Sequence, residues 1–75
     1  AGVMVQEVVQ GGSAAQSGIK QNDIITSFNG QPTFTNDQLV SLVKNTKVGD
    51  TVNVKLIRNG QTLDIKVKML KSSGF

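Results

Sequence analysis

The sequence predicts a small α+β domain in which antiparallel strands pack with two helices. Three stretches of the chain support this fold class. Residues 51–58 and 61–69 alternate apolar and polar side chains around an Asn-Gly pair, residues 35–46 carry helix signals, and residues 11–30 are rich in turn residues. Alternation with a period of two is typical of half-buried strands, and an Asn-Gly pair between two such runs is typical of a tight hairpin.

The hairpin has a register that follows from its two-residue turn, Asn59-Gly60. The apolar pairs that this register predicts are Leu56–Leu63, Val54–Ile65 and Val52–Val67. Because these side chains share one face, a slip by one residue would expose all of them, so the register is well specified. On the other face Lys55 is expected to oppose Asp64, an exposed pair that contributes under ~1 kcal/mol.

The clearest helix signal begins at Thr35. Thr35 and Gln38 have the spacing of a capping box, and Phe34 and Leu39 that of a hydrophobic staple. The helix is predicted over Asn36–Thr46.

Two apolar stripes run along this helix, one formed by Leu39 and Leu42 and the other by Val40 and Val43. An apolar face this wide can contact the core and also line a groove. The alternative is that all four side chains belong to the core.

Residues 11–30 predict a short helix, a tight turn, a strand and a second turn. The short helix is expected at Ser13–Ser17, with Ser13 as the capping residue of the turn that follows it. Gly18 stands where a left-handed terminal residue is needed. Residues 24–28 are interpreted as a buried strand, and Asn29-Gly30 turns the chain again.

Two expectations concern the flanking segments. Residues 3–9 are predicted to form a first strand, which ends at Gly11-Gly12. Pro32 marks an edge strand or a loop, because proline lacks the N–H that a central strand needs.

The composition argues against catalysis. The chain has no cysteine and no histidine, which excludes disulfides, Cys/His zinc sites and a Ser-His-Asp triad. Its acids do not pair at a spacing that suits acid–base work; they are Glu7, Asp23, Asp37, Asp50 and Asp64. No glycine-rich phosphate loop opens a long helix. The chain is therefore expected to be neither an enzyme nor a cofactor- or metal-binding protein.

The net charge of +3 raises the question of nucleic-acid binding, since the basic residues concentrate after Thr51. Stacking side chains are lacking, because there is no Tyr or Trp and the three Phe do not alternate with the basic residues. We therefore expect no nucleic-acid partner. We interpret the lysines as residues that keep an exposed strand face soluble.

The sequence resembles a PDZ domain over roughly residues 2–70. The resemblance depends on Gly-Val-Met-Val at 2–5, Gly-Gly-Ser-Ala-Ala-Gln-Ser-Gly-Ile-Lys-Gln-Asn-Asp-Ile-Ile at 11–25 and Phe-Asn-Gly at 28–30. The family usually has proline where Ala14 stands and glycine where Asn22 stands. Gly-Asp-Thr-Val at 49–52 and Arg-Asn-Gly at 58–60, followed by an alternating strand, resemble the PDZ domains of bacterial HtrA-type, DegP-like serine proteases.

The resemblance implies a PDZ-like, partly open antiparallel β-barrel or sandwich with two helices. It also implies a peptide-binding module, in which a C-terminal or extended hydrophobic peptide adds as a strand beside a sheet edge and one helix. Carried over to this sequence, Asn36 selects the third-from-last peptide side chain, and Val40 and Val43 shape the pocket for the last one. The implied partners are such peptides or unfolded proteins and an attached trypsin-like protease domain, in a bacterial extracytoplasmic location.

The resemblance also implies a gap. In the bacterial arrangement the carboxylate-binding loop and the strand that pairs with the peptide come before the position of Gly2, so half of the groove is expected to be absent from this sequence. One alternative is therefore a truncated structural fragment that binds nothing alone. Another is a PDZ domain from a different envelope protein, such as a carboxyl-terminal processing protease, an intramembrane metalloprotease or a secretion component.

Residues 1–70 are expected to form one domain and residues 71–75 a flexible tail. Phe75 ends this sequence with an apolar side chain and a carboxylate, so it resembles a PDZ ligand. Self-association through Phe75, with the tail of one molecule docked on the next, is therefore a further hypothesis.

Overall fold

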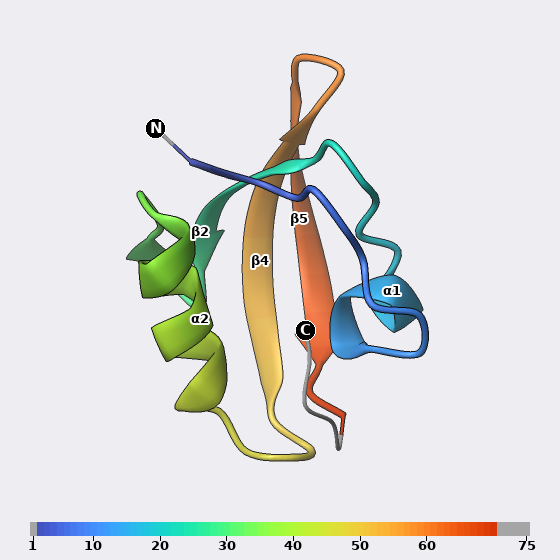
Figure 1. Ribbon diagram of the computed structural model, residues 1–75, viewed down its shortest axis with the longest axis vertical. Helices are drawn as coiled ribbons and strands as arrows, with labels where there is room; N and C mark the ends of the chain where they lie inside the picture. The colour runs from blue at the N-terminus through green and yellow to red at the C-terminus, as the bar shows by residue number, and fades with distance from the viewer. Residues whose placement is uncertain (1, 71–75) are drawn as a thin grey trace.

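The computed structural model describes residues 2–70 of the chain. Its elements are β1 (Val3–Met4), α1 (Ser13–Ser17), β2 (Ile24–Phe28), β3 (Gln31–Pro32), α2 (Asn36–Lys44), β4 (Thr51–Arg58) and β5 (Gln61–Lys68). Figure 1 shows β2, β4 and β5 side by side, with α2 on one side of them and α1 on the other. The predicted α+β class is confirmed, and the antiparallel sheet is open.

The sheet has the strand order β1-β2-β4-β5, and β3 also pairs with β2. β1 and β3 pair with different halves of the same strand: Val3 lies opposite Ile25 in the first half, and Ser27 lies opposite Pro32 in the second. Pro32 therefore occupies a short edge strand, which is one of the two alternatives that the sequence left open. The second edge of β1 has no strand partner among residues 2–70.

The β4–β5 hairpin has the predicted register in every pair, including Lys55 opposite Asp64. Its turn is the tight form that Asn-Gly favours, because Asn59 and Gly60 both have positive φ, at 53° and 78°. The apolar face of the hairpin packs into the core, which consists of Val3, Ala14, Ile19, Ile25, Phe28, Leu39, Val52, Val54, Leu56, Val67 and Met69. Leu63 and Ile65 lie on the edge strand, so they are only half-buried and pack against this core.

α2 begins as predicted and ends two residues earlier. The Gln38 N–H donates to the Thr35 hydroxyl at 3.1 Å, and the Gln38 side chain accepts from the Phe34 N–H at 2.9 Å. The last helical residue is Lys44, so the prediction of Thr46 as the end is wrong. The reason is local: Thr46 donates both its N–H, at 3.1 Å, and its hydroxyl, at 2.6 Å, to the Val43 carbonyl. These bonds close the last turn more tightly than an α-helix does.

α1 lies where it was predicted, but the role expected for Ser13 is wrong. The capping residue is Gly12, and no side chain caps the helix. Ser13 is already inside the helix and fully buried, and its hydroxyl accepts the Leu70 N–H at 2.8 Å. Through this hydrogen bond Ser13 connects α1 to the segment that follows β5. Gly18 ends the helix in the left-handed conformation, with φ 93°, as predicted.

The first strand is much shorter than predicted. Only Val3 and Met4 are in β1, although the strand was expected to continue to residue 9. The partner strand explains the difference. Met4 pairs with Ile24, the first residue of β2, and the segment that precedes Ile24 turns at Asn22. The Val5 N–H still donates to the Asp23 carbonyl, at 2.8 Å, but β2 has no residues that could pair with the chain after Val5.

Two further findings concern the C-terminal residues of the chain and the length of its helices. Phe75 and the rest of residues 71–75 lie outside the described residues, and so do the predictions made for them. No helix within residues 2–70 has the length and apolar character needed to span a membrane.

Candidate functional site

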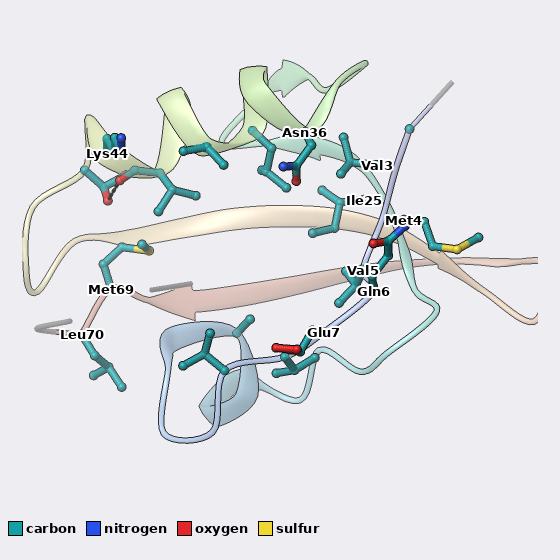
Figure 2. Close-up of a pocket in the computed structure, with 18 of the residues that line it drawn as sticks. Val3, Met4, Val5, Gln6, Glu7, Ile25, Asn36, Lys44, Met69 and Leu70 are labelled. Atoms are coloured by element: carbon teal, nitrogen blue, oxygen red, sulfur yellow. Dashed lines mark hydrogen bonds between the residues drawn. The ribbon is translucent and has the colours of Figure 1, made fainter. Parts of the chain in front are cut away.

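A groove of about 930 Å³ lies between α2 and residues 2–9. Figure 2 shows α2 along one wall and the N-terminal segment crossing the other side, with Ile25 between them and Met69 at one end. Ile25 and Met69 are buried core residues, so the base of the groove is the core itself. The groove therefore opens along the unpaired edge of β1.

The exposed apolar side chains of the molecule gather at this groove. Among the described residues five large apolar side chains are exposed, and all five line it: Met4 (53%), Val9 (50%), Phe34 (59%), Val40 (41%) and Val48 (68%). Scattered single apolar residues are normal on protein surfaces, whereas a contiguous apolar surface marks an interaction site. Their shared position around one groove makes this groove the candidate functional site.

The α2 wall separates core residues from groove residues. Leu39 is buried, and Leu42 and Val43 are half-buried and pack against the core. Val40 is exposed, so the alternative that all four apolar residues of α2 belong to the core is wrong for this residue. Val40 and Val43 both line the groove.

Asn36, Val40 and Val43, the three residues predicted for peptide binding, all lie on the α2 wall. Asn36 is the first residue of α2 and lies at the end of the groove opposite Lys44 (Figure 2). Their contact with a peptide stays a prediction. The opposite wall is Gly2–Val9, for which the sequence analysis predicted a strand over residues 3–9 and assigned no binding role.

The start of the opposite wall is held close to β2. A Cβ atom at Gly2 would lie 2.6 Å from the Cγ2 atom of Ile24, so only glycine fits there without a shift. Farther along, Val5 bonds to the Asp23 carbonyl at 2.8 Å, and the Asn22 N–H donates to the Val5 carbonyl at 2.7 Å. The turn at residues 22–23 therefore fixes the position of this wall.

That turn is held by an ion pair that the sequence analysis missed. The Asp23 carboxylate is buried and accepts the Nε and Nη2 donors of Arg58 at 2.8 and 2.6 Å. It also accepts the Lys20 N–H at 2.8 Å, while Arg58 Nη2 reaches the Gly18 carbonyl at 3.0 Å. The hydrogen bonds from Arg58 lower the pKa of Asp23, against the opposing effect of burial. The available signal was an aspartate three residues after Lys20 and directly before a buried strand, a spacing that suits a side chain bonded to its own turn.

Few titratable side chains line the groove. Residues 2–70 contain no group of three His, Cys, Asp or Glu side chains placed to hold a metal ion. The titratable side chains that line the groove are Glu7, Lys44 and Lys47, all exposed.

A sheet edge beside a helix, with an apolar groove between them, is the arrangement by which small domains bind an extended segment as an added strand. The family described as PDZ domain matches residues 1–69, and the chain belongs to this family.

The chain is similar to a segment of HtrA-type serine proteases. It is 44% identical over 68 residues to the serine protease Do-like HtrA of Lactobacillus helveticus, covering 91% of this chain and 16% of that protein. It is 40% identical over 68 residues to the periplasmic pH-dependent serine endoprotease DegQ of Escherichia coli, covering 91% of this chain and 15% of that protein. The chain thus spans about a sixth of the length of these relatives, and it matches their non-catalytic PDZ domain.

Solved structures agree with this assignment. The serine endoprotease from Yersinia pestis superposes with a TM-score of 0.86 at 33% identity, covering 89% of this chain and 25% of that one. The PDZ domain of the SdrC-like protein from Listeria monocytogenes gives a TM-score of 0.79 at 25% identity, covering 92% and 72%. The predicted PDZ-like fold is confirmed.

Proposed function

We propose that this domain binds extended peptide segments with apolar side chains in the groove between β1 and α2. The observation that carries the proposal is the gathering of every exposed large apolar side chain of residues 2–70 around this one groove. The unpaired edge of β1 supports it, because a free edge offers backbone groups to an added strand.

The α2 wall supplies the side-chain contacts in this proposal. Val40 is exposed and Val43 half-buried, so together they present an apolar surface that continues into the core. An apolar side chain of the ligand, at its C-terminus or within an extended segment, packs against them. Asn36, exposed at the far end of the same wall, hydrogen-bonds a polar ligand side chain about two residues away.

We further propose that the domain recognises substrate or regulates an attached serine protease domain in an extracytoplasmic protein. The support is the similarity to HtrA-type proteases, among them a periplasmic one. The same similarity favours this assignment over the other envelope proteins that the sequence left open. The open groove favours a binding module over an inert fragment.

An NMR titration tests the binding proposal. A short peptide with a hydrophobic C-terminus is added to ¹⁵N-labelled domain, and we expect amide shifts to concentrate around Val40 and Val43. Val40→Glu is expected to abolish these shifts. Ser41→Glu is the matched control, since Ser41 is an exposed neighbour on α2 outside the groove lining. Val43 is less suitable for a charge substitution, because it packs against the core.

The result that overturns the proposal is an unchanged spectrum at millimolar peptide. Equal loss of binding in the two glutamate variants would place the ligand elsewhere. Both variants should keep the amide dispersion of the folded domain.

A further inference from the structure

We propose that Lys44 and Lys47 make this groove selective for peptides in which an Asp or Glu side chain lies next to the bound apolar residue. The inference depends on the proposed function, and it names the ligand chemistry that the groove favours. The ligand acid is a side-chain carboxylate within the peptide.

Both lysines are placed to meet a ligand held by the apolar wall. Lys44 follows Val40 by four residues, so the two side chains lie on the same face of α2, one turn apart. Lys47 follows in the loop after α2, and both residues line the groove. Figure 2 shows Lys44 and Met69 at the same end of the groove, opposite Asn36.

Neither lysine side chain is in an ion pair within the described part of the chain, although the Asp50 carboxylate accepts the backbone N–H of Lys47 at 2.9 Å. No carboxylate of residues 2–70 lies within 4.0 Å of either ammonium group, whereas Arg58 is paired with Asp23 at 2.6 Å. A favourable interaction with the helix dipole accounts for a lysine at position 44, the last residue of α2. It does not account for Lys47, which lies outside the helix.

The opposite wall carries the opposite charge. Glu7 is the one acidic side chain among the described residues that line the groove, and it projects from the N-terminal segment (Figure 2). A ligand carboxylate is therefore repelled from that wall and attracted to the C-terminal end of α2.

A double-mutant cycle tests this inference. Two eight-residue peptides, acetylated and amidated so that neither end is charged, differ only in Glu or Gln next to a central Val. Fluorescence anisotropy measures their affinity for the wild-type domain, for Lys44→Gln/Lys47→Gln and for Lys66→Gln/Lys68→Gln. The second pair is the matched control: its lysines are exposed on β5 outside the groove lining, and both variants lower the net charge from +3 by the same two units.

We expect the Glu peptide to bind the wild-type domain roughly fivefold more tightly than the Gln peptide, the size expected for two exposed ion pairs. Lys44→Gln/Lys47→Gln should remove this ratio, and Lys66→Gln/Lys68→Gln should keep it. Equal loss in both variants would mean bulk charge and would overturn the inference.

A third peptide distinguishes a side-chain carboxylate from a C-terminal carboxylate as the recognised group. It carries Gln and a free C-terminus; if it alone gains affinity through Lys44 and Lys47, the recognised group is a terminus and the inference is wrong. Equal binding of the Glu and Gln peptides to the wild-type domain overturns the inference and leaves the proposed function standing. Absence of binding by all three peptides at millimolar concentration overturns both.

Discussion

In the β4–β5 hairpin every residue of Thr51–Arg58 and Gln61–Lys68 lies in a strand, whereas in residues 2–9 only Val3 and Met4 do. Both regions are rich in valine and other strand-forming residues. They differ in the partner that is available. Each strand of the hairpin pairs with the other across a two-residue turn, but β2 begins only at Ile24, so Gln6–Val9 have no strand to pair with.

The difference separates scaffold from binding surface. The hairpin buries its apolar face in the core, and its strands satisfy each other's backbone groups. The N-terminal segment keeps its apolar side chains beside the groove, with Met4 and Val9 each about half exposed. Among the described residues β1 and β5 are both terminal strands of the sheet, and the unpaired edge that borders the groove is that of β1.

The largest effect on stability is expected from a substitution in the β4–β5 hairpin. Leu56→Ala removes a fully buried side chain from β4 and is expected to destabilise the domain by about 3 kcal/mol. Met4→Ala, in the exposed N-terminal segment, should cost under about 0.5 kcal/mol. Urea unfolding followed by circular dichroism measures both. Similar losses for the two variants would show that the Met4 side chain belongs to the core.

The second prediction concerns the Asp23–Arg58 ion pair, which connects the hairpin to the turn beside the N-terminal segment. Asp23→Asn removes the carboxylate that joins Arg58 at the end of β4 to the turn that holds Val5. Loss of these charged hydrogen bonds should cost about 2 kcal/mol, measured by urea unfolding near neutral pH. Asp64→Asn is the control, because Asp64 is exposed and faces Lys55 without a similar network. An Asp23→Asn variant as stable as the control would contradict the assigned role.

The same ion pair predicts a pH dependence with a definite sign. Arg58 lowers the pKa of Asp23 below its ordinary value of 3.8, so the folded state favours the ionised carboxylate. The pair therefore stabilises the domain fully above that value, and its contribution is lost as the pH falls through the lower pKa of the folded state. Unfolding midpoints between about pH 6 and pH 2 should fall less steeply in Asp23→Asn than in the wild type. Parallel curves would show that other acids carry the dependence.

A smaller effect is expected on the side of α1. Ser13→Ala removes the acceptor of the Leu70 N–H and should cost about 1 kcal/mol. Hydrogen exchange measures it directly, since the Leu70 amide should exchange faster while amides of the hairpin keep their protection. Unchanged exchange at Leu70 would mean that another group takes over as acceptor.

Local patterns predicted most of the scaffold. The hairpin register follows from alternation and one Asn-Gly pair, and the start of α2 from the Thr35–Gln38 capping box, because these signals act over a few residues. The length of β1 depends on where β2 begins, some twenty residues later, so it is not visible in the local pattern. The same holds for Asp23, whose partner Arg58 is brought to it only by the pairing of β2 with β4.

The candidate site was predictable in part for the same reason. Periodicity showed that Val40 and Val43 are neighbours on α2, and the family resemblance gave them a role. The groove itself needs the position of a second wall, which is set by the turn at Asn22 and Asp23. Glu7, Lys44 and Lys47 were therefore not assigned to one site from the sequence.

The last prediction concerns the hydrogen exchange of single backbone amides at the edge of β1. The Val5 N–H donates to the carbonyl of Asp23, the residue before β2. Neighbouring N–H groups of an extended segment point to opposite sides, so the Met4 N–H points away from β2 toward the unpaired edge. In the free domain the Met4 amide should exchange quickly and those of β4 and β5 slowly. If a peptide adds as a strand along β1, the Met4 amide becomes protected while Val5, already bonded, changes little. Binding that shifts Val40 and leaves Met4 unprotected would mean that the ligand packs on α2 alone, and strand addition at β1 would be wrong.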